Sequence, residues 1–307
     1  MRFRDSDCVL QVALMQRFLA LTLYAGAVLT ALFAQALPPV YFNHITIFLS
    51  PETYAALLQS PFLRDEFSAF SEHTVHRDGG AWSYTGIFIS GQHTYLELFK
   101  AGPGMHFGSA TITTTPGQIV FNMWIDNRTL LPLFRDRLAA ETGSRLHVDV
   151  GRNAQNQPMY DLVVSEGGPA SEFGPDMRID TEIKGYYPDG ITREKRLERA
   201  YIPARSMHDV TSFTLTTNEN ERSRLIHQFR AYSYDIGAAG AEKQIVSGPE
   251  ITFALVLTKP GLPRTLVIDF STNNTRTTQQ TLKFTDASQL RIQGGTAQWV
   301  FTFPSNE

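Results

Sequence analysis

The sequence predicts an α+β protein built from a repeated unit of one strand, one helix and three more strands (βαβββ). Two observations predict this class. Short runs in which apolar and polar residues alternate, as they do in half-buried strands, outnumber the helical segments. The same order of predicted elements also recurs along the chain, over about residues 41–100, 108–187 and 208–271.

The first stretch opens with an alternating run, YFNHITIFL, which predicts a strand over residues 41–49. Ser50 then stands at an N-cap position, Pro51 at the first helical position and Glu52 in the first turn, so a helix is expected to begin here. The helix covers TYAALLQ, breaks near Ser60-Pro61 and continues helically through PFLRDEFSAF. Glycine-containing turns separate three further predicted strands, SEHTVHR, SYTGIFIS and HTYLELFK.

The second and third stretches repeat this order. In the second, the strand GQIVFNMWI precedes a helix, RTLLPLFRDRLAAET, which Asp126 or Asn127 caps; the strands RLHVDVG, MYDLVVSE and MRIDTEIKGYY follow. In the third, the strand HDVTSFTL precedes the helix NENERSRLIHQFRAY and the strands ITFALVLTK and RTLVIDFST. The tail, with TLKFTD, QLRIQ and AQWVFTF, forms either a sheet edge or a fourth partial unit.

Composition excludes several classes of protein. A chain of 307 residues exceeds what one hydrophobic core usually holds, and 42% hydrophobic residues with 19% charged residues argue against disorder. The formal net charge of −3 makes nucleic acid an unexpected main partner. Cys8 is the single cysteine, so neither a disulfide framework nor a cysteine-based zinc site is expected.

The N-terminal segment has the pattern of a secretory signal peptide. An uncharged apolar run, residues 18–34, follows Arg17 and ends in Ala34-Gln35-Ala36, which predicts cleavage after Ala36. The run is short for a spanning helix, and no membrane span is expected after cleavage. Met15 is an alternative start. The mature chain is therefore expected to be exported, to the periplasm or the medium.

These patterns predict four segments. Residues 1–36 form the signal peptide and 37–187 two paired βαβββ units. Residues 188–206 form a charged connection, and 207–307 form a third βαβββ-like unit with the C-terminal strands.

The repeated unit resembles the building block of the vicinal oxygen chelate superfamily, which includes glyoxalases and extradiol dioxygenases. The resemblance rests on FNHITIFL as the first strand and TYLELF as the last strand of the first unit. The same region is similar to a group of exported bacterial glyoxalase-like proteins of uncharacterised function. The resemblance to the superfamily implies that two units pair into a cupped sheet, and that their first and last strands hold one divalent ion.

The resemblance implies a set of site residues. His44 and Glu97 in the first unit and Gln118 and Glu182 in the second would be metal ligands, with Glu97 and Glu182 as catalytic carboxylates. The third unit offers an alternative pair, His208 and Asp269. Such nitrogen and oxygen donors suit Zn²⁺, Mn²⁺, Ni²⁺ or Fe²⁺.

Each of these residues also has an ordinary explanation. His44 stands at a strand start, where histidines often only form hydrogen bonds. Gln118 follows Pro116-Gly117, which is typical of a turn, and Glu182 belongs to an alternating polar row that describes a solvated strand face. Glu97 is the most informative residue, because a carboxylate between two leucines needs a partner if it is buried.

Two functions from different classes fit these expectations. The first is a glyoxalase-like, metal-dependent lyase, isomerase or dioxygenase that acts on a small oxygen-bearing organic molecule. The second is a non-enzymatic protein that binds a small molecule in the same cavity, and a scaffold without ligand is a third possibility. No G-x-S-x-G, Walker or dinucleotide motif occurs, so no nucleotide cofactor is expected. Substrate and oligomeric state stay open.

Overall fold

The computed structural model describes residues 39–77, 82–107, 110–125, 131–142, 146–152, 158–165, 179–186, 197–198, 200–238, 240, 242–259, 261–273 and 278–305.

The first module runs from a buried strand to a helix and back into the sheet. The module consists of β1 (Tyr41–Leu49), α2 (Pro51–Leu58), a π-helical turn η1 (Leu63–Phe67), β2 (Ala69–Arg77), β3 (Trp82–Ser90) and β4 (Tyr95–Lys100). The Ser50 side chain accepts a hydrogen bond from the Thr53 amide at 3.2 Å, so the predicted N-cap is confirmed.

The second module has the same order after an inserted hairpin. The hairpin, which the sequence patterns did not predict, consists of β5 (Pro103–Phe107) and β6 (Ala110–Thr113). The module then contains β7 (Ile119–Trp124), α3 (Leu131–Thr142), β8 (Leu146–Arg152), β9 (Pro158–Ser165) and β10 (Ile179–Tyr186). Both predicted caps of its helix, Asp126 and Asn127, lie outside the described residues.

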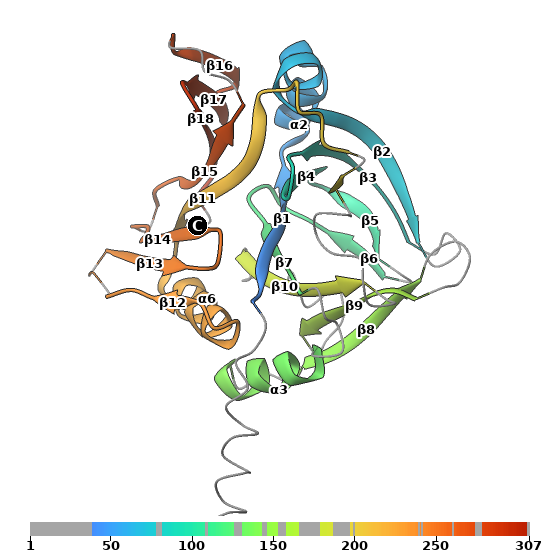
Figure 1. Ribbon diagram of the computed structural model, residues 1–307, viewed down its shortest axis with the longest axis vertical. Coiled ribbons are helices and arrows are strands. Elements are labelled where there is room, and N and C mark those ends of the chain that lie inside the picture. Colours follow the sequence, from blue (N-terminus) through green and yellow to red (C-terminus); the bar gives the residue numbers. More distant parts are fainter. Residues whose placement is uncertain are drawn as a thin grey trace, which may run out of the picture. The chain divides into compact units, whose positions relative to one another are not determined.

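The two modules form one sheet, sheet A, in the order β6-β5-β3-β4-β1-β7-β10-β9-β8, with β2 paired to β3. In each module the first and last strands are parallel neighbours, β1 with β4 and β7 with β10. The two first strands, β1 and β7, pair antiparallel and join the modules. Sheet A curves strongly (Figure 1). The predicted fold class, α+β with paired βαβββ units in a cupped sheet, is confirmed.

The rest of the chain forms a second sheet, sheet B, in the order β12-β13-β14-β11-β15-β18-β17-β16. Its first part repeats the module, because β11 (Met207–Thr217) and β14 (Thr252–Leu257) are parallel neighbours. Between them lie α6 (Glu219–Ala231), β12 (Asp235–Ile236) and β13 (Lys243–Ser247). The sequence patterns missed β12 and β13.

The remaining strands of sheet B are antiparallel. They are β15 (Arg264–Thr272), β16 (Gln280–Thr285), β17 (Ser288–Gln293) and β18 (Thr296–Phe303). The run RTLVIDFST, expected as the last strand of the third unit, is β15 and instead pairs antiparallel with β11. The described residues between β15 and β18 contain no helix, so this group is a partial unit.

An ion pair connects α6 to β15. Asn218 and Glu221 form a reciprocal capping box at the start of α6. The buried Glu221 carboxylate also forms an ion pair with the Arg264 guanidinium, with Nη1 of Arg264 and Oε1 of Glu221 3.1 Å apart. Burial lowers the pKa of Arg264, and the neighbouring Glu221 charge partly opposes that shift. The pair therefore fixes the first turn of the helix on the sheet.

Aromatic side chains fill the space between the two sheets. The Phe213 ring of sheet B packs edge-on against Phe42 and Phe121 of sheet A, with ring centroids 5.0 and 4.9 Å apart. Phe253 packs against Phe121 at 5.1 Å and against Phe229 of α6 at 4.6 Å. All these rings are buried, so they form an apolar core between the two sheets.

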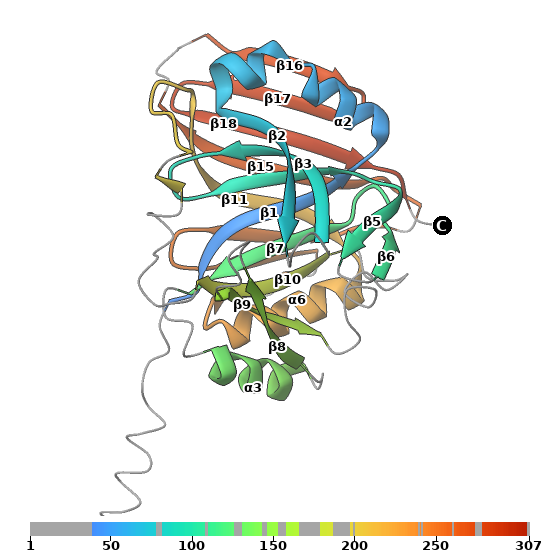
Figure 2. The ribbon, with the colours of Figure 1, turned by 90° about the vertical axis from the view of Figure 1, so that its right-hand side faces the viewer.

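The first module also covers part of sheet B. Figure 2 shows α2 lying over β16 and β17, in a group whose described residues contain no helix. Phe67 of η1 packs edge-on against Phe270 and Trp299, with ring centroids 5.7 and 6.1 Å apart. The helical segment formed by α2 and η1 thus covers part of the second sheet.

The predicted segment boundaries fall largely outside the described residues. The described residues belong to one compact unit, Pro39–Glu307, and the predicted signal peptide precedes them in the sequence. Of the predicted connection, only residues 197–198 and 200–206 are described; the Ser206 amide donates to the carbonyl of Glu66 at 3.0 Å. Within the described ranges no helix is long and apolar enough to cross a membrane.

We expect the substitution Phe213→Ala to lower the free energy of unfolding by about 3–5 kcal/mol, because it opens a cavity between the sheets. Thr214→Ala, on the half-buried opposite face of the same strand, should cost about 1 kcal/mol or less. Urea unfolding of both variants measures the difference. Equal losses would contradict the assignment of this face as the inter-sheet core.

Candidate functional site

The candidate site lies on the face of sheet A that is turned away from sheet B. The pairing of β1 with β7 shifts register between Phe42 and His44, with Asn43 as the extra residue. Phe42 therefore faces sheet B, whereas His44 pairs with Asn122 on the opposite, outer face. A single bulge thus turns a histidine away from the apolar core.

A histidine and a carboxylate meet at the centre of this face. His44 on β1 and Glu97 on β4 are 2% and 8% exposed, and His44 Nε2 lies 3.5 Å from Glu97 Oε2. Parallel pairing of the two strands brings them together, because Glu97 is opposite Thr46, two residues after His44. A buried titratable pair of this kind is a common mark of a functional site.

Hydroxyl groups hold the Glu97 carboxylate in place. Tyr95 donates its phenolic hydrogen to Oε1, and Thr46 donates its hydroxyl hydrogen to Oε2, each at 3.3 Å. Burial of a carboxylate is costly unless such donors replace the lost water. The orientation of Glu97 is therefore set from both of its oxygens.

The neighbours of His44 define which of its nitrogens faces Glu97. The imidazole stacks on the Tyr95 ring at 4.2 Å, and Asn43 Nδ2 lies 3.1 Å from His44 Nδ1. An amide nitrogen only donates, so Nδ1 accepts this bond and the ring proton sits on Nε2. In this arrangement the Nε2–H group is directed at the Glu97 carboxylate.

The second module contributes to the same face through Asn122. This buried side chain on β7 donates from Nδ2 to Thr46 Oγ1 at 3.1 Å and to the Val120 carbonyl at 3.3 Å. On the next strand, Glu182 occupies the register position opposite Asn122, as Glu97 does opposite Thr46. The backbone thus relates Glu182 to Glu97 across the junction of the modules, while the Glu182 side chain lies outside the described part.

The surroundings of the pair are aromatic. Phe48 and Phe99 pack together with their ring centroids 5.6 Å apart, and the Tyr84 ring meets Phe99 edge-on at 5.3 Å. Gly86 lies beside the Phe99 ring so closely that a Cβ atom at this position would collide with it. Phe48, Phe99 and Tyr84 form aromatic walls on the strands that hold the polar pair or adjoin them, and aromatic residues are common in small-molecule sites.

The structure separates the residues that the sequence suggested. It brings His44 and Glu97 together, but Gln118 stands before β7, where its Oε1 accepts from the Thr115 amide at 2.9 Å. His208 and Asp269 lie in sheet B; Asp269 accepts from Ser212 at 2.6 Å and from Gln298 at 3.0 Å. Among the described residues, no group of three or more His, Cys, Asp or Glu could hold a metal ion.

Sequence reasoning missed Thr46, Tyr95 and Asn122. The signal for Asn122 was present, because an asparagine inside the apolar run IVFNMW is a buried polar group that needs a partner. Thr46 had no distinguishing pattern.

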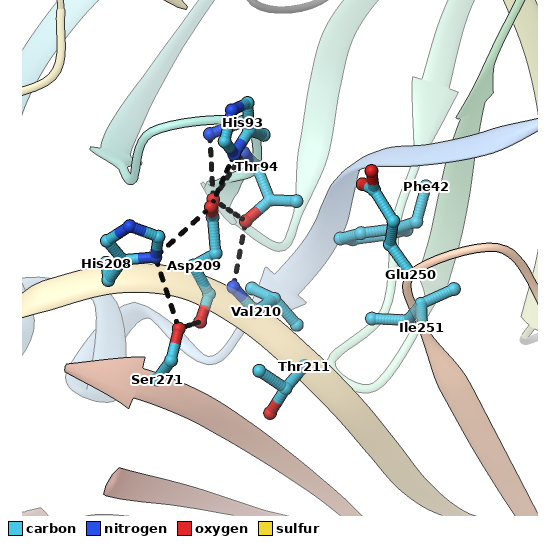
Figure 3. Close-up of a pocket in the computed structure, with 10 residues that line it drawn as sticks. All are labelled: Phe42, His93, Thr94, His208, Asp209, Val210, Thr211, Glu250, Ile251 and Ser271. Atoms are coloured by element: carbon cyan, nitrogen blue, oxygen red, sulfur yellow. Dashed lines mark hydrogen bonds and ion pairs between the residues drawn. The ribbon is translucent and has the colours of Figure 1, made fainter. Parts of the chain in front are cut away.

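A second polar cluster lies where the β3–β4 turn meets β11 (Figure 3). It borders a pocket of about 210 Å³ whose lining includes Phe42, His93, His208, Asp209 and Ser271. Asp209 accepts hydrogen bonds from the His93 and Thr94 amides and from the Thr94 hydroxyl, and its Oδ2 lies 2.8 Å from His93 Nδ1. His208 Nδ1 approaches the same carboxylate at 3.4 Å.

Two βαβββ modules that join through their first strands, with a polar centre on their shared outer face, define a vicinal oxygen chelate-like fold. A model of a family of unknown function (DUF5829) matches residues 42–128, which include His44, Glu97 and Asn122. No curated protein matches the sequence significantly.

Two solved structures are similar at low identity. A hypothetical protein from Staphylococcus aureus is 10% identical, with 72% of this chain and 87% of that chain covered and a TM-score of 0.46. A mutant of 4-hydroxymandelate synthase from Streptomyces coelicolor is 13% identical, with 72% and 63% covered and a TM-score of 0.36. Similarity at this level assigns no activity to this chain.

We expect Thr46 and Asn122 to be energetically coupled, because their hydrogen bond joins the two modules inside the sheet. A double-mutant cycle with Thr46→Val and Asn122→Leu should give a coupling free energy of about 1 kcal/mol in chemical unfolding. The exposed hydroxyl pair Thr74 and Thr85, 2.7 Å apart, serves as the control and should couple more weakly. Additive losses for Thr46 and Asn122 would contradict this bond.

Proposed function

We propose that this chain is a glyoxalase-like enzyme that acts on a small oxygen-bearing organic molecule with the help of a divalent metal ion. One observation carries the proposal: His44 Nε2 and Glu97 Oε2, two good metal donors, lie 3.5 Å apart on a buried face with aromatic walls. Two atoms at this separation can both bond one ion at about 2.0–2.2 Å.

The donor set suits a borderline or hard divalent ion. Glu182, by its register opposite Asn122, is the third ligand in this proposal, and the Oδ1 atom of Asn122 is the fourth. Imidazole and carboxylate donors fit Zn²⁺, Mn²⁺, Ni²⁺ or Fe²⁺. Such an ion, when bound, would polarise a carbonyl group or lower the pKa of a bound water.

The residues of the chain have separate tasks in this proposal. Tyr95 and Thr46 orient the Glu97 carboxylate. Binding of an ion at His44 Nε2 would move the ring proton to Nδ1, and the Asn43 amide would turn so that its Oδ1 accepts that proton. Glu97 and Glu182 are the candidates for proton transfer, each able to serve as a base when it does not bind the ion. The aromatic walls would contact the apolar part of the substrate and exclude water.

A non-enzymatic binding function is the second candidate, and one observation favours it. The Glu97 carboxylate already has an imidazole and two hydroxyl groups as partners, so the chain can satisfy it without a metal ion. In that case the same face would hold a small molecule through its aromatic walls alone.

The metal content of the purified mature protein tests the proposal. We expect about one ion per chain after loading with Zn²⁺, Mn²⁺, Ni²⁺ or Fe²⁺, and a loss of at least about tenfold in affinity for Glu97→Gln, which removes a charged ligand. Glu52→Gln, an exposed carboxylate on α2, is the matched control and should bind as the wild type does. Failure of the wild type to take up any of the four ions would favour the binding function instead.

We also propose that the protein is exported and that a signal peptidase removes residues 1–36. Intact-mass measurement of the chain from the exported fraction should give a protein that begins at Leu37. Ala36→Phe, which places a bulky residue at the cleavage position, should leave the segment attached. An exported chain of full mass would contradict this proposal.

A further inference from the structure

The anchor of the β3–β4 turn comes from the other sheet. Asp209, near the start of β11, accepts the His93 amide at 2.8 Å, and the Thr94 amide and hydroxyl at 2.9 Å each. These three donors converge on Oδ1, while His93 Nδ1 meets Oδ2 at 2.8 Å. The Asp209 side chain is only 13% exposed, so these bonds replace most of its hydration.

Further contacts hold the same turn against β11. The Gln92 amide donates to the His208 carbonyl at 2.8 Å, and the Val210 amide donates to the Thr94 hydroxyl at 2.9 Å. Gly91 approaches the His208 carbonyl so closely that a Cβ atom would collide with it. Figure 3 shows His93 and Thr94 on one side of the Asp209 carboxylate and β11 on the other.

The anchored turn leads directly into the candidate site. Thr94 is followed by Tyr95, the first residue of β4, whose ring stacks on His44 and whose hydroxyl donates to Glu97. Strand residues advance about 3.3 Å each, so Glu97 stands only about 10 Å along the strand from the anchor. A shift of β4 by one residue would turn both Tyr95 and Glu97 to the opposite face.

We propose that Asp209 is a positioning residue for the candidate site: by holding the start of β4, it places Tyr95 and Glu97 against His44. The metal-binding part of this inference rests on the proposed function, whereas the placement of Tyr95 does not. Sheet B thereby contributes to a site whose own residues all lie in sheet A.

Three variants test the inference. Asp209→Ala removes every acceptor, whereas Asp209→Asn keeps an oxygen for the His93 and Thr94 amides and loses only the acceptor at Oδ2. Asp269→Asn is the matched control, because Asp269 also belongs to sheet B and also accepts side-chain bonds, but from Ser212 of β11 and Gln298 of β18 rather than from the turn.

The first readout needs no metal. The ring protons of His44 are shifted by the stacked Tyr95 ring, so their NMR resonances report the placement of β4. We expect Asp209→Ala to move these resonances away from their wild-type positions. In Asp209→Asn they should lie close to the wild-type positions, and in Asp269→Asn they should not move. Unchanged His44 resonances in both Asp209 variants would overturn the inference. If Asp209→Ala does not fold, Asp209→Asn with Thr94→Val, which removes two more contacts of the anchor, takes its place.

The second readout is Co²⁺ titration, with the visible spectrum as a monitor of ligand geometry. Asp209→Ala should weaken Co²⁺ binding about 10–100-fold, as loss of a group that supports a ligand usually does, and Asp209→Asn should recover most of this loss. If Asp209→Ala leaves the Co²⁺ affinity and spectrum unaltered while Glu97→Gln weakens Co²⁺ binding, the positioning role is overturned and the proposed metal function is not. If Glu97→Gln also binds Co²⁺ normally, the proposed metal function fails, and the His44 resonances then decide the positioning role.

Discussion

Packing of aromatic side chains between the sheets is the constraint on which the arrangement of the molecule depends. Phe42 and Phe121 of sheet A meet Phe213 and Phe253 of sheet B and bury these parts of the facing sheets. The polar pair His44 and Glu97 lies on the other face of sheet A, where it does not interrupt this apolar packing. The bulge at Asn43 allows β1 to direct Phe42 toward sheet B and His44 toward the opposite face.

The outer face then depends on how the modules join. Because β1 and β7 are neighbours, hydrogen bonds run without interruption from Asn122 through Thr46 to Glu97. Neither module contains this series alone. The polar centre consequently lies at the junction between the modules. Because His44 and Glu97 stand on strands of a rigid sheet, their positions are well defined.

Much of the first module could be predicted from local signals. Alternation marked β1, and Ser50-Pro51 marked the start of α2, because both signals lie within a few residues. Glu97 was recognisable because a carboxylate in an apolar strand must have a partner. Asn122 carried a similar signal, but its place beside the pair could not be predicted, because only the antiparallel register brings it opposite His44. Short strands such as β12 and the hairpin of β5 and β6 carry too few residues for a periodicity to emerge.

The absence of a helix from the described part of the β15–β18 group has a consequence for how such a chain can evolve. Part of the cover of this group comes from α2 and η1, which precede β16 by more than 200 residues. Gene fission, or exchange of one half with a homologue, would remove Phe67 from its contacts with Phe270 and Trp299. Although the architecture repeats one unit, its halves are therefore expected to be inherited together in a single chain.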